Sequence, residues 1–185
     1  MIFLLASIAL ALVLVPLTGG SFERLGRLHF SWLWLLLAAL AIQIPLDWVS
    51  FPKDRVDDLG VGLLLLSYAM ILAFCVLNRR VKGMAIVTIG IALNVLVIAL
   101  NQGMPAKDDV VTRHGREVHV PVERTVKHRP RQDGDLLPFL SDVLTLPHVP
   151  NEQFSVGDVI ISLGLVDICF EGSRRPRRRG VPVPT

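Results

Sequence analysis

Five polar side chains lie in or beside apolar stretches of the chain, where amide and carboxyl groups are uncommon. They are Gln43, Asn94, Asn101, Asp142 and Asp158. A polar group inside a membrane is costly and usually faces the interior of a helix bundle. Carboxylates and amides gathered there can bind a small ligand, an ion or a proton. We therefore take these five as candidate ligand-binding residues and assign no catalytic residue.

The depth of these residues in the predicted helices suggests a shared polar layer. Four helices each contribute a polar group near the same end of the bundle: Gln43, Ser67 or Tyr68, Asn94, and Asp158. Such a layer would form a site open to the outer side. The alternative is interhelical hydrogen bonding, which is commonly worth about 0.6 kcal/mol per pair.

Asp158 has a structural alternative of its own. Ser155 stands three residues before it, at the start of an apolar run. This spacing is typical of a capping box, in which the serine caps the helix and the acid lies in the first turn. We therefore expect a structural role for Asp158 by default, and ligand binding as the sharper hypothesis.

The elements that must position these residues are long apolar stretches. Hydrophobic residues make up 52% of the 185 residues, and an apolar run of about 20 residues is needed to cross about 30 Å of hydrocarbon. The predicted spans are residues 2–17, 28–49, 59–78, 84–100 and 154–170. The fold class is thus an all-α membrane protein, a bundle of about five transmembrane helices. A membrane domain over 1–170 precedes a basic cytoplasmic tail over 171–185.

The orientation follows from the basic residues of the short connections, which stay on the cytoplasmic side. One side carries ten of them: Arg24, Arg27, Arg79, Arg80, Lys82 and five arginines of the tail. The other side has only Lys53 and Arg55 in its short loop. We therefore predict a plasma-membrane protein with its N-terminus outside and its C-terminus in the cytoplasm. Residues 2–17 lack a basic segment before them, so we expect an uncleaved anchor rather than a signal peptide.

One long connection, residues 101–153, is predicted to lie outside. Apolar and polar residues alternate around REVHVPV, which predicts a short hairpin. The following LLPFLSDVLTLP is apolar, about a dozen residues long and bracketed by Pro138 and Pro147. Its helical spacing predicts an interfacial or re-entrant helix on the outer leaflet.

Small residues predict which helices pack together. Two predicted helices each carry a pair of glycines seven residues apart, Gly83 with Gly90 and Gly157 with Gly164. A flat stripe of this kind lets another helix approach closely. We expect the spans 84–100 and 154–170 to pack, which would bring Asn94 near Asp158.

Other chemistry is not indicated. The histidines show no ligand spacing for a metal, and Cys75 and Cys169 lie in apolar runs, so we expect no metal, cofactor or disulfide framework. The arginine tail favours anionic lipid headgroups beside the lipid bilayer. A membrane-protein partner is a further expectation, and nucleic acid is not expected.

Three motifs give the chain a family resemblance: NQGMP (101–105), LPFLSDVLTLP (137–147) and FSVGD (154–158). With them the chain resembles an uncharacterised bacterial integral-membrane family, domain of unknown function 5317. Glycine often stands in that family where this chain has Gln102 and Ser141. The resemblance implies a bacterial plasma-membrane protein of several helices and no activity.

We expect a non-enzymatic membrane protein that contacts a partner or small ligand through its outer face and long loop. The alternative is a membrane enzyme or small transporter that uses Asp158, Asp142 and Asn94 around an outer-facing cavity. A third option is an assembly or regulatory subunit, which would leave an apolar stripe uncovered.

Overall fold

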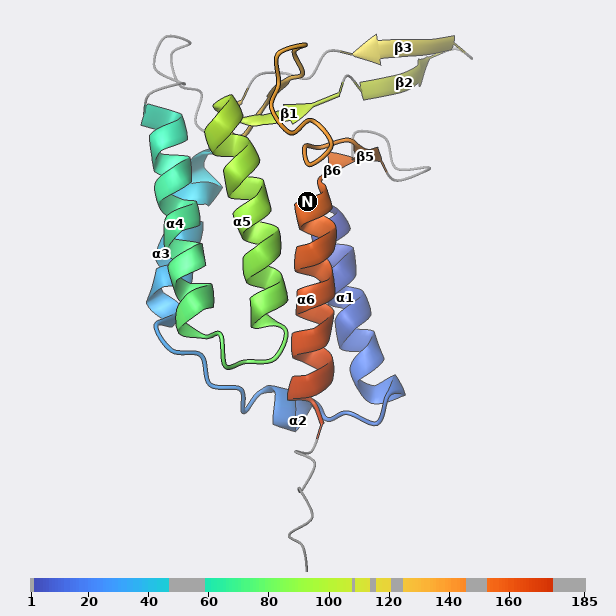
Figure 1. Ribbon diagram of the computed structural model, residues 1–185. Helices are drawn as coiled ribbons and strands as arrows, with labels where there is room; N and C mark the ends of the chain where they lie inside the picture. Colours follow the sequence, from blue (N-terminus) through green and yellow to red (C-terminus); the bar gives the residue numbers. More distant parts are fainter. Residues whose placement is uncertain are drawn as a thin grey trace, which may run out of the picture.

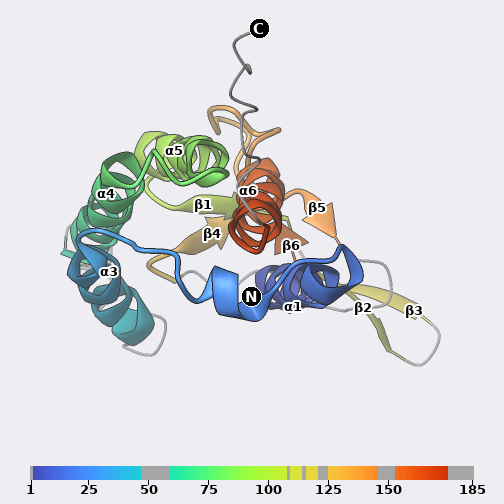
Figure 2. The same ribbon diagram turned by 90° about the horizontal axis from the view of Figure 1, so that it is seen from below.

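The computed structural model describes residues 2–46, 59–107, 109–113, 116–120, 125–145 and 153–174. This part of the chain is mostly helical and contains six helices: α1 (Ile2–Leu17), α2 (Phe22–Leu25), α3 (Leu33–Leu46), α4 (Val61–Leu77), α5 (Met84–Asn101) and α6 (Val156–Gly172). The five longer helices run side by side (Figure 1). Seen along their axes, they follow an arc in the order α3, α4, α5, α6, α1 (Figure 2).

Four of the predicted spans agree with α1, α4, α5 and α6 to within two residues at each end. Within the described residues, α5 is the one helix long and apolar enough to cross a membrane by length and composition. Three shorter apolar helices accompany it, over 3–17, 33–46 and 61–77. α6 carries three acidic residues, Asp158, Asp167 and Glu171.

The span predicted over 28–49 starts too early, because α3 begins only at Leu33. Trp32 adopts a φ of 58°, a left-handed conformation that a helix cannot include. Ser31 is fixed before it by the Asn78 side chain, which accepts from the Ser31 N–H and donates to the Ser31 carbonyl, both at 2.8 Å. A contact from α4 therefore keeps these residues out of the helix. Residues 47–49 lie outside the described part.

The first and last helices in the sequence are neighbours. At one end of α1 the ring of Phe3 stacks on Phe154, with centroids 4.1 Å apart. At the other end the Ser21 N–H donates to the Ser173 carbonyl at 3.0 Å. α1 is therefore fastened to both ends of α6.

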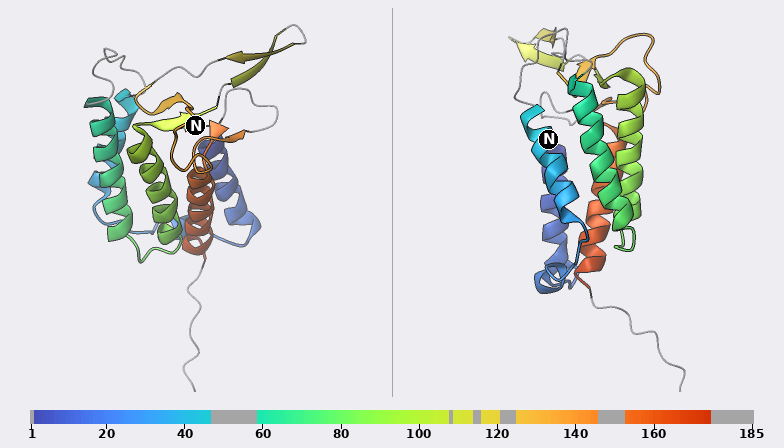
Figure 3. Two further views of the ribbon diagram at one scale, coloured as in Figure 1. Left: turned by 45° about the horizontal axis from the view of Figure 1, so that its top comes forward. Right: turned by 90° about the vertical axis from the view of Figure 1, so that its left-hand side faces the viewer.

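Short strands lie at one end of the bundle (Figure 3), and the described residues contain six of them. They are β1 (Met104–Ala106), β2 (Asp109–Arg113), β3 (Arg116–Val120), β4 (His128–Pro130), β5 (Leu144–Thr145) and β6 (Gln153–Phe154). β1 pairs with β4 in parallel, whereas β2 with β3 and β5 with β6 pair antiparallel. The β2–β3 pair confirms the predicted hairpin. We call the described residues of 103–154 the cap.

The predicted interfacial or re-entrant helix is wrong. The described residues 136–145 form turns that end in β5. Leu137 has a φ of 53° and is followed by Pro138, and a residue before proline is disfavoured in the helical region. Asp142 then joins β1 through a bridge to Ala106, and its N–H donates to the Pro105 carbonyl at 3.2 Å. Pro147 lies outside the described residues.

Gln102, at the junction between α5 and the cap, also adopts a left-handed conformation, with a φ of 53°. Glycine adopts this conformation without strain. The glycine that the resemblance implies at this position would therefore have a backbone reason. The other departure, Ser141, is completely buried in the cap.

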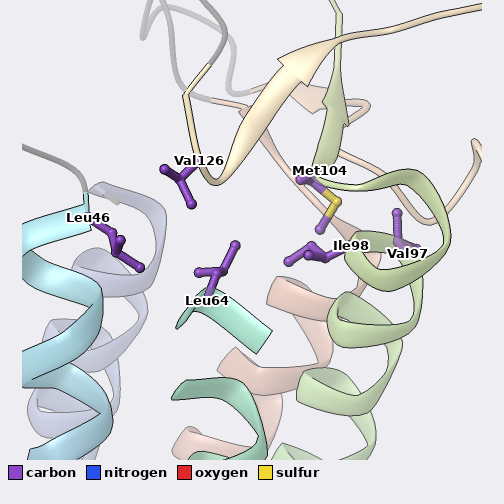
Figure 4. Close-up of a cluster of buried hydrophobic side chains, with 6 residues drawn as sticks. All are labelled: Leu46, Leu64, Val97, Ile98, Met104 and Val126. Carbon is purple, nitrogen blue, oxygen red and sulfur yellow. The ribbon is translucent and has the colours of Figure 1, made fainter. Parts of the chain in front are cut away.

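Two apolar clusters hold the helices together. One lies directly below the cap and combines α3, α4 and α5 with the cap: Leu46, Leu64, Val97, Ile98, Met104 and Val126 (Figure 4). The other is formed by α4, α5 and α6: Phe74, Cys75, Met84, Val87, Ile91 and Ile168. The cap is thus part of the hydrophobic core and continuous with the bundle.

Candidate functional site

α5 and α6 make the most extensive contact between helices in the described part of the chain. Glycines permit it. A Cβ added at Gly90 would lie 2.6 Å from the Gly157 carbonyl oxygen, and one added at Gly164 would lie 2.7 Å from the Val87 nitrogen. No side chain fits at these distances, so the backbones themselves touch. The predicted packing of these two helices is confirmed.

This contact brings Asn94 of α5 against the first turn of α6. Asn94 Nδ2 donates to Asp158 Oδ1 at 2.9 Å, and Asn94 Oδ1 accepts from Ser155 Oγ at 2.8 Å. Ser155 Oγ accepts from the Asp158 N–H at 3.0 Å, and Asp158 Oδ2 accepts from the Ser155 N–H at 3.0 Å. The three residues form a closed hydrogen-bonded ring.

The predicted capping box is confirmed, with Ser155 as the N-cap of α6. Ser155 is completely buried and Asn94 is 5% exposed. Both carboxylate oxygens of Asp158 accept hydrogen bonds inside this ring. The arrangement therefore gives acceptors to the Ser155 and Asp158 N–H groups at the helix start and ties that start to α5.

Gln43 belongs to a different pair of helices. Its Nε2 donates to Ser67 Oγ at 3.0 Å, and Ser67 Oγ donates to the Leu64 carbonyl at 2.7 Å. Ser67 is completely buried. Gln43 thus links α3 to α4 through its hydrogen bond with Ser67.

Asn101, the last residue of α5, fastens the cap to the bundle. Its side chain donates to the Leu136 carbonyl at 3.0 Å and accepts from the Leu136 N–H at 2.8 Å. Its Nδ2 also donates to the Val97 carbonyl at 2.8 Å. Asn101 therefore replaces the backbone partner that Leu136 would have in a sheet.

Sequence reasoning missed the ion pair between Arg129 and Asp135, which are nearly buried in the cap. Arg129 Nε also donates to the Asn101 carbonyl at 2.7 Å, and Asp135 Oδ2 accepts from the Gln132 N–H at 2.9 Å. Burial raises the pKa of the Asp135 carboxyl, but the hydrogen bonds from Gln132 and Arg129 and the charges of Arg129 and Arg131 hold the pKa below its ordinary value of 3.8. The only sequence signal is an acid six residues after an arginine in a strongly charged segment.

Asp142 also lies in the cap. It is 4% exposed, and its Oδ2 lies 3.3 Å from Nε2 of His128. The five predicted residues therefore fall into three groups according to their interaction partners. Asn94 and Asp158 meet at the α5–α6 contact, Gln43 bridges α3 and α4, and Asn101 and Asp142 hold the cap.

One of three comparisons with known proteins agrees with the resemblance seen in the motifs. A search of the curated proteins and a search of the solved structures each found no significant match. The scan against protein-family models matches residues 27–170, which extend from just after α2 through most of α6. Because this match covers most of the chain, the protein belongs to the family of unknown function DUF5317.

Proposed function

We propose that this protein is a multi-pass protein of the bacterial plasma membrane that binds a partner or small ligand at its outer face and catalyses no reaction. Large apolar side chains are at least half exposed on every long helix, among them Leu5, Leu37, Leu66, Ile89 and Leu163. Large apolar side chains exposed on every long helix are unfavourable in water and suit contact with acyl chains. α3 is only about 21 Å long, so a bilayer around it would thin locally.

The distribution of charge supports the proposed orientation. Arg79, Arg80 and Lys82 follow α4 at the end of the bundle away from the cap, where Arg24 and Arg27 also lie. Basic residues stay in the cytoplasm, so the cap would face outward. Trp32 and Trp34 are both more than half exposed near the same basic end. Tryptophan is enriched at the membrane interface, which is consistent with a bilayer boundary at the start of α3.

The single observation that carries the non-enzymatic proposal is the closed ring of Asn94, Ser155 and Asp158. A catalytic or transport carboxylate must reach its substrate, but both oxygens of Asp158 already accept hydrogen bonds within the ring. Asp142, the second acid of the enzyme or transporter alternative, faces His128 in the cap. Both acids therefore have structural partners.

The binding surface of this proposal is the cap. Its turn over 136–140 exposes two large apolar side chains, Leu136 at 53% and Phe139 at 64%. The turn is held by Asn101 below and by the Arg129–Asp135 pair beside it. Apolar side chains presented on a fixed support are typical of interface anchors.

Photo-crosslinking in intact cells tests the proposal. A photoreactive amino acid placed at Phe139 is expected to give a discrete protein adduct or ligand adduct. The same amino acid at Leu163, which is 60% exposed on α6, serves as the control and is expected to label only lipid. Identical adducts at both positions, or none at Phe139, would refute binding through the cap.

The orientation is tested separately, by labelling single cysteines with a membrane-impermeant maleimide. Asp133→Cys lies in the exposed part of the cap and Arg27→Cys at the basic end. We expect labelling of the first in intact cells and of the second only after lysis. The opposite pattern would invert the proposed topology.

A further inference from the structure

A pocket of about 570 Å³ lies at the end of the bundle away from the cap. It forms where the chain leading into α3 meets the turn between α4 and α5, both at the lower end in Figure 1. Its lining is His29, Ser31, Val76, Leu77, Asn78, Arg79, Arg80 and Val81. The lining contains two guanidinium groups and an imidazole and no carboxylate.

Asn78 gives this pocket a fixed shape. Its side chain is bonded on both sides to the backbone of Ser31, and its Nδ2 also donates to the Phe74 carbonyl at 2.8 Å. Asn78 is 4% exposed. The Asn78 amide therefore links the end of α4 to the segment that leads into α3. The groups that can contact a ligand in the pocket are then the basic side chains and Ser31.

The two arginines of the pocket differ from the other basic residues at this end. Within the described residues, Arg27 pairs with Glu23, Lys82 pairs with Glu171, and Arg24 donates to the Ser173 carbonyl. Arg79 and Arg80 are exposed and form no ion pair with any residue that the structure describes. Their charge is available to an anion.

The end of α4 does not cancel this charge. Anions are disfavoured at a helix C-terminus because of its free carbonyls. Here the Phe74 and Cys75 carbonyls accept from the Asn78 N–H, and the Val76 carbonyl accepts from the Arg79 N–H. The charges of Arg79 and Arg80 therefore lie at an end of α4 where most of the free carbonyls already accept hydrogen bonds.

The remaining wall of the pocket is apolar and open. Val76 and Leu77 are each 51% exposed, on the side of α4 that would face acyl chains in the proposed membrane. We propose that the pocket binds the phosphate of an anionic phospholipid, with Arg79, Arg80 and His29 around the headgroup and Val76 and Leu77 against the start of an acyl chain. Basic pockets at the cytoplasmic side of membrane helices recognise such headgroups.

This site rests on the membrane placement proposed above, yet it lies far from the cap and involves none of its residues. A ligand of this site needs only a phosphate group and an adjoining apolar chain. Failure of lipid binding here would leave the crosslinking result at Phe139 unaffected, and the reverse also holds.

The test is native mass spectrometry of the full-length protein in detergent, with phosphatidylglycerol or phosphatidylcholine of identical acyl chains added. We expect the parent to retain phosphatidylglycerol in preference to phosphatidylcholine. The double variant Arg79→Gln, Arg80→Gln is expected to bind phosphatidylglycerol about thirtyfold more weakly. The matched control Arg27→Gln, Lys82→Gln changes the charge equally outside the pocket and is expected to bind like the parent.

All these variants keep the arginines of the tail, so a difference between them reports on the pocket and not on the tail. Equal loss in both double variants would show diffuse charge attraction and overturn the site, as would equal retention of both lipids by the parent. Displacement of lipid by millimolar glycerol phosphate would assign the pocket to a soluble phosphate compound instead. If the arginine variant does not fold, Ser31→Asp places a negative charge in the pocket, and undiminished binding in that variant would overturn the proposal.

Discussion

Asn94 and Asp158, 64 residues apart in the sequence, are joined by a hydrogen bond of 2.9 Å between α5 and α6. Asn94 simultaneously accepts from Ser155, the residue that caps α6. One amide therefore holds both members of the capping box. The start of α6 and its position against α5 depend on the same side chain.

Replacing Asn94 by alanine tests this double role. The change removes the acceptor of the buried Ser155 hydroxyl and a donor to Asp158, so we expect a loss of about 1–3 kcal/mol in the free energy of unfolding. Thermal unfolding in detergent measures it. Leu96→Ala, at an exposed position of the same helix, is the control and should cost less. An unchanged melting temperature in Asn94→Ala together with loss of a co-purified small molecule would favour a ligand site instead.

The backbone contact between α5 and α6 predicts a strong effect of one methyl group. Gly90→Ala would place a Cβ 2.6 Å from the Gly157 oxygen, which forces the helices apart and should destabilise by about 1–3 kcal/mol. Gly62→Ala is the matched control, because nothing lies within 4 Å of its added Cβ in α4. Alanine is the better helix former, so this control should be neutral or stabilising by up to about 1 kcal/mol. Equal melting temperatures for the two variants would contradict the close approach.

The Arg129–Asp135 pair predicts an acid-sensitive cap. Because the folded-state pKa of Asp135 lies below its ordinary value of 3.8, its contribution to stability is present above that value and is lost as the pH falls through the folded pKa. Asp135→Asn should cost about 3–5 kcal/mol at neutral pH, since Arg129 then stays buried without its partner. The difference between parent and variant, followed by pH-dependent thermal unfolding, should shrink below about pH 4. The exposed Asp133→Asn is the control and should be as stable as the parent at neutral pH. A difference between parent and Asp135→Asn that stays constant with pH would disprove the role of Asp135 ionisation.

The hydrogen bonds of Asn101 predict what holds the cap against the helices. Asn101→Ala removes three hydrogen bonds, two of them to Leu136, so the cap should detach more often while the helices persist. Limited digestion with trypsin reads this out at the exposed Arg131, and we expect cleavage there to be several-fold faster than in the parent. Leu100→Ala changes a neighbouring exposed side chain and should leave the cleavage rate unchanged. Equal rates in both variants would mean that Asn101 does not hold the cap.

The sequence predicts most helices well because each apolar run is bounded by glycine or charge. α5, for example, begins after Gly83, whose φ of 84° is left-handed and ends the preceding turn. The glycine spacing in α5 and α6 also contains the packing information, and the position of Asn94 beside Asp158 follows from it. Local pattern is sufficient where the partner helix needs only a smooth surface.

The errors arise where a distant residue decides the backbone. Apolar residues flank Ser31 and Trp32, so the sequence pattern predicts a helix there. Asn78, 47 residues away, instead holds Ser31 in another conformation. Asp142 reads as the polar face of a helix, but it joins β1. The Arg129–Asp135 pair is likewise invisible locally, because the same segment offers several other basic residues as partners. Only the fold selects among these alternatives.

The attachment of α1 to both ends of α6 has a consequence for biosynthesis. α1 precedes Phe154 and Ser173, which fasten it, by more than a hundred residues, so it is made well before them. Ala11 and Val15 of α1 are almost completely buried in the finished protein, so these side chains stay without their final neighbours throughout translation of the rest of the chain. The arc from α3 to α5 can assemble before α6 is made, whereas the contact between α1 and α6 forms only afterwards. Of the described helices, the earliest in the chain therefore depends on a contact with the latest one.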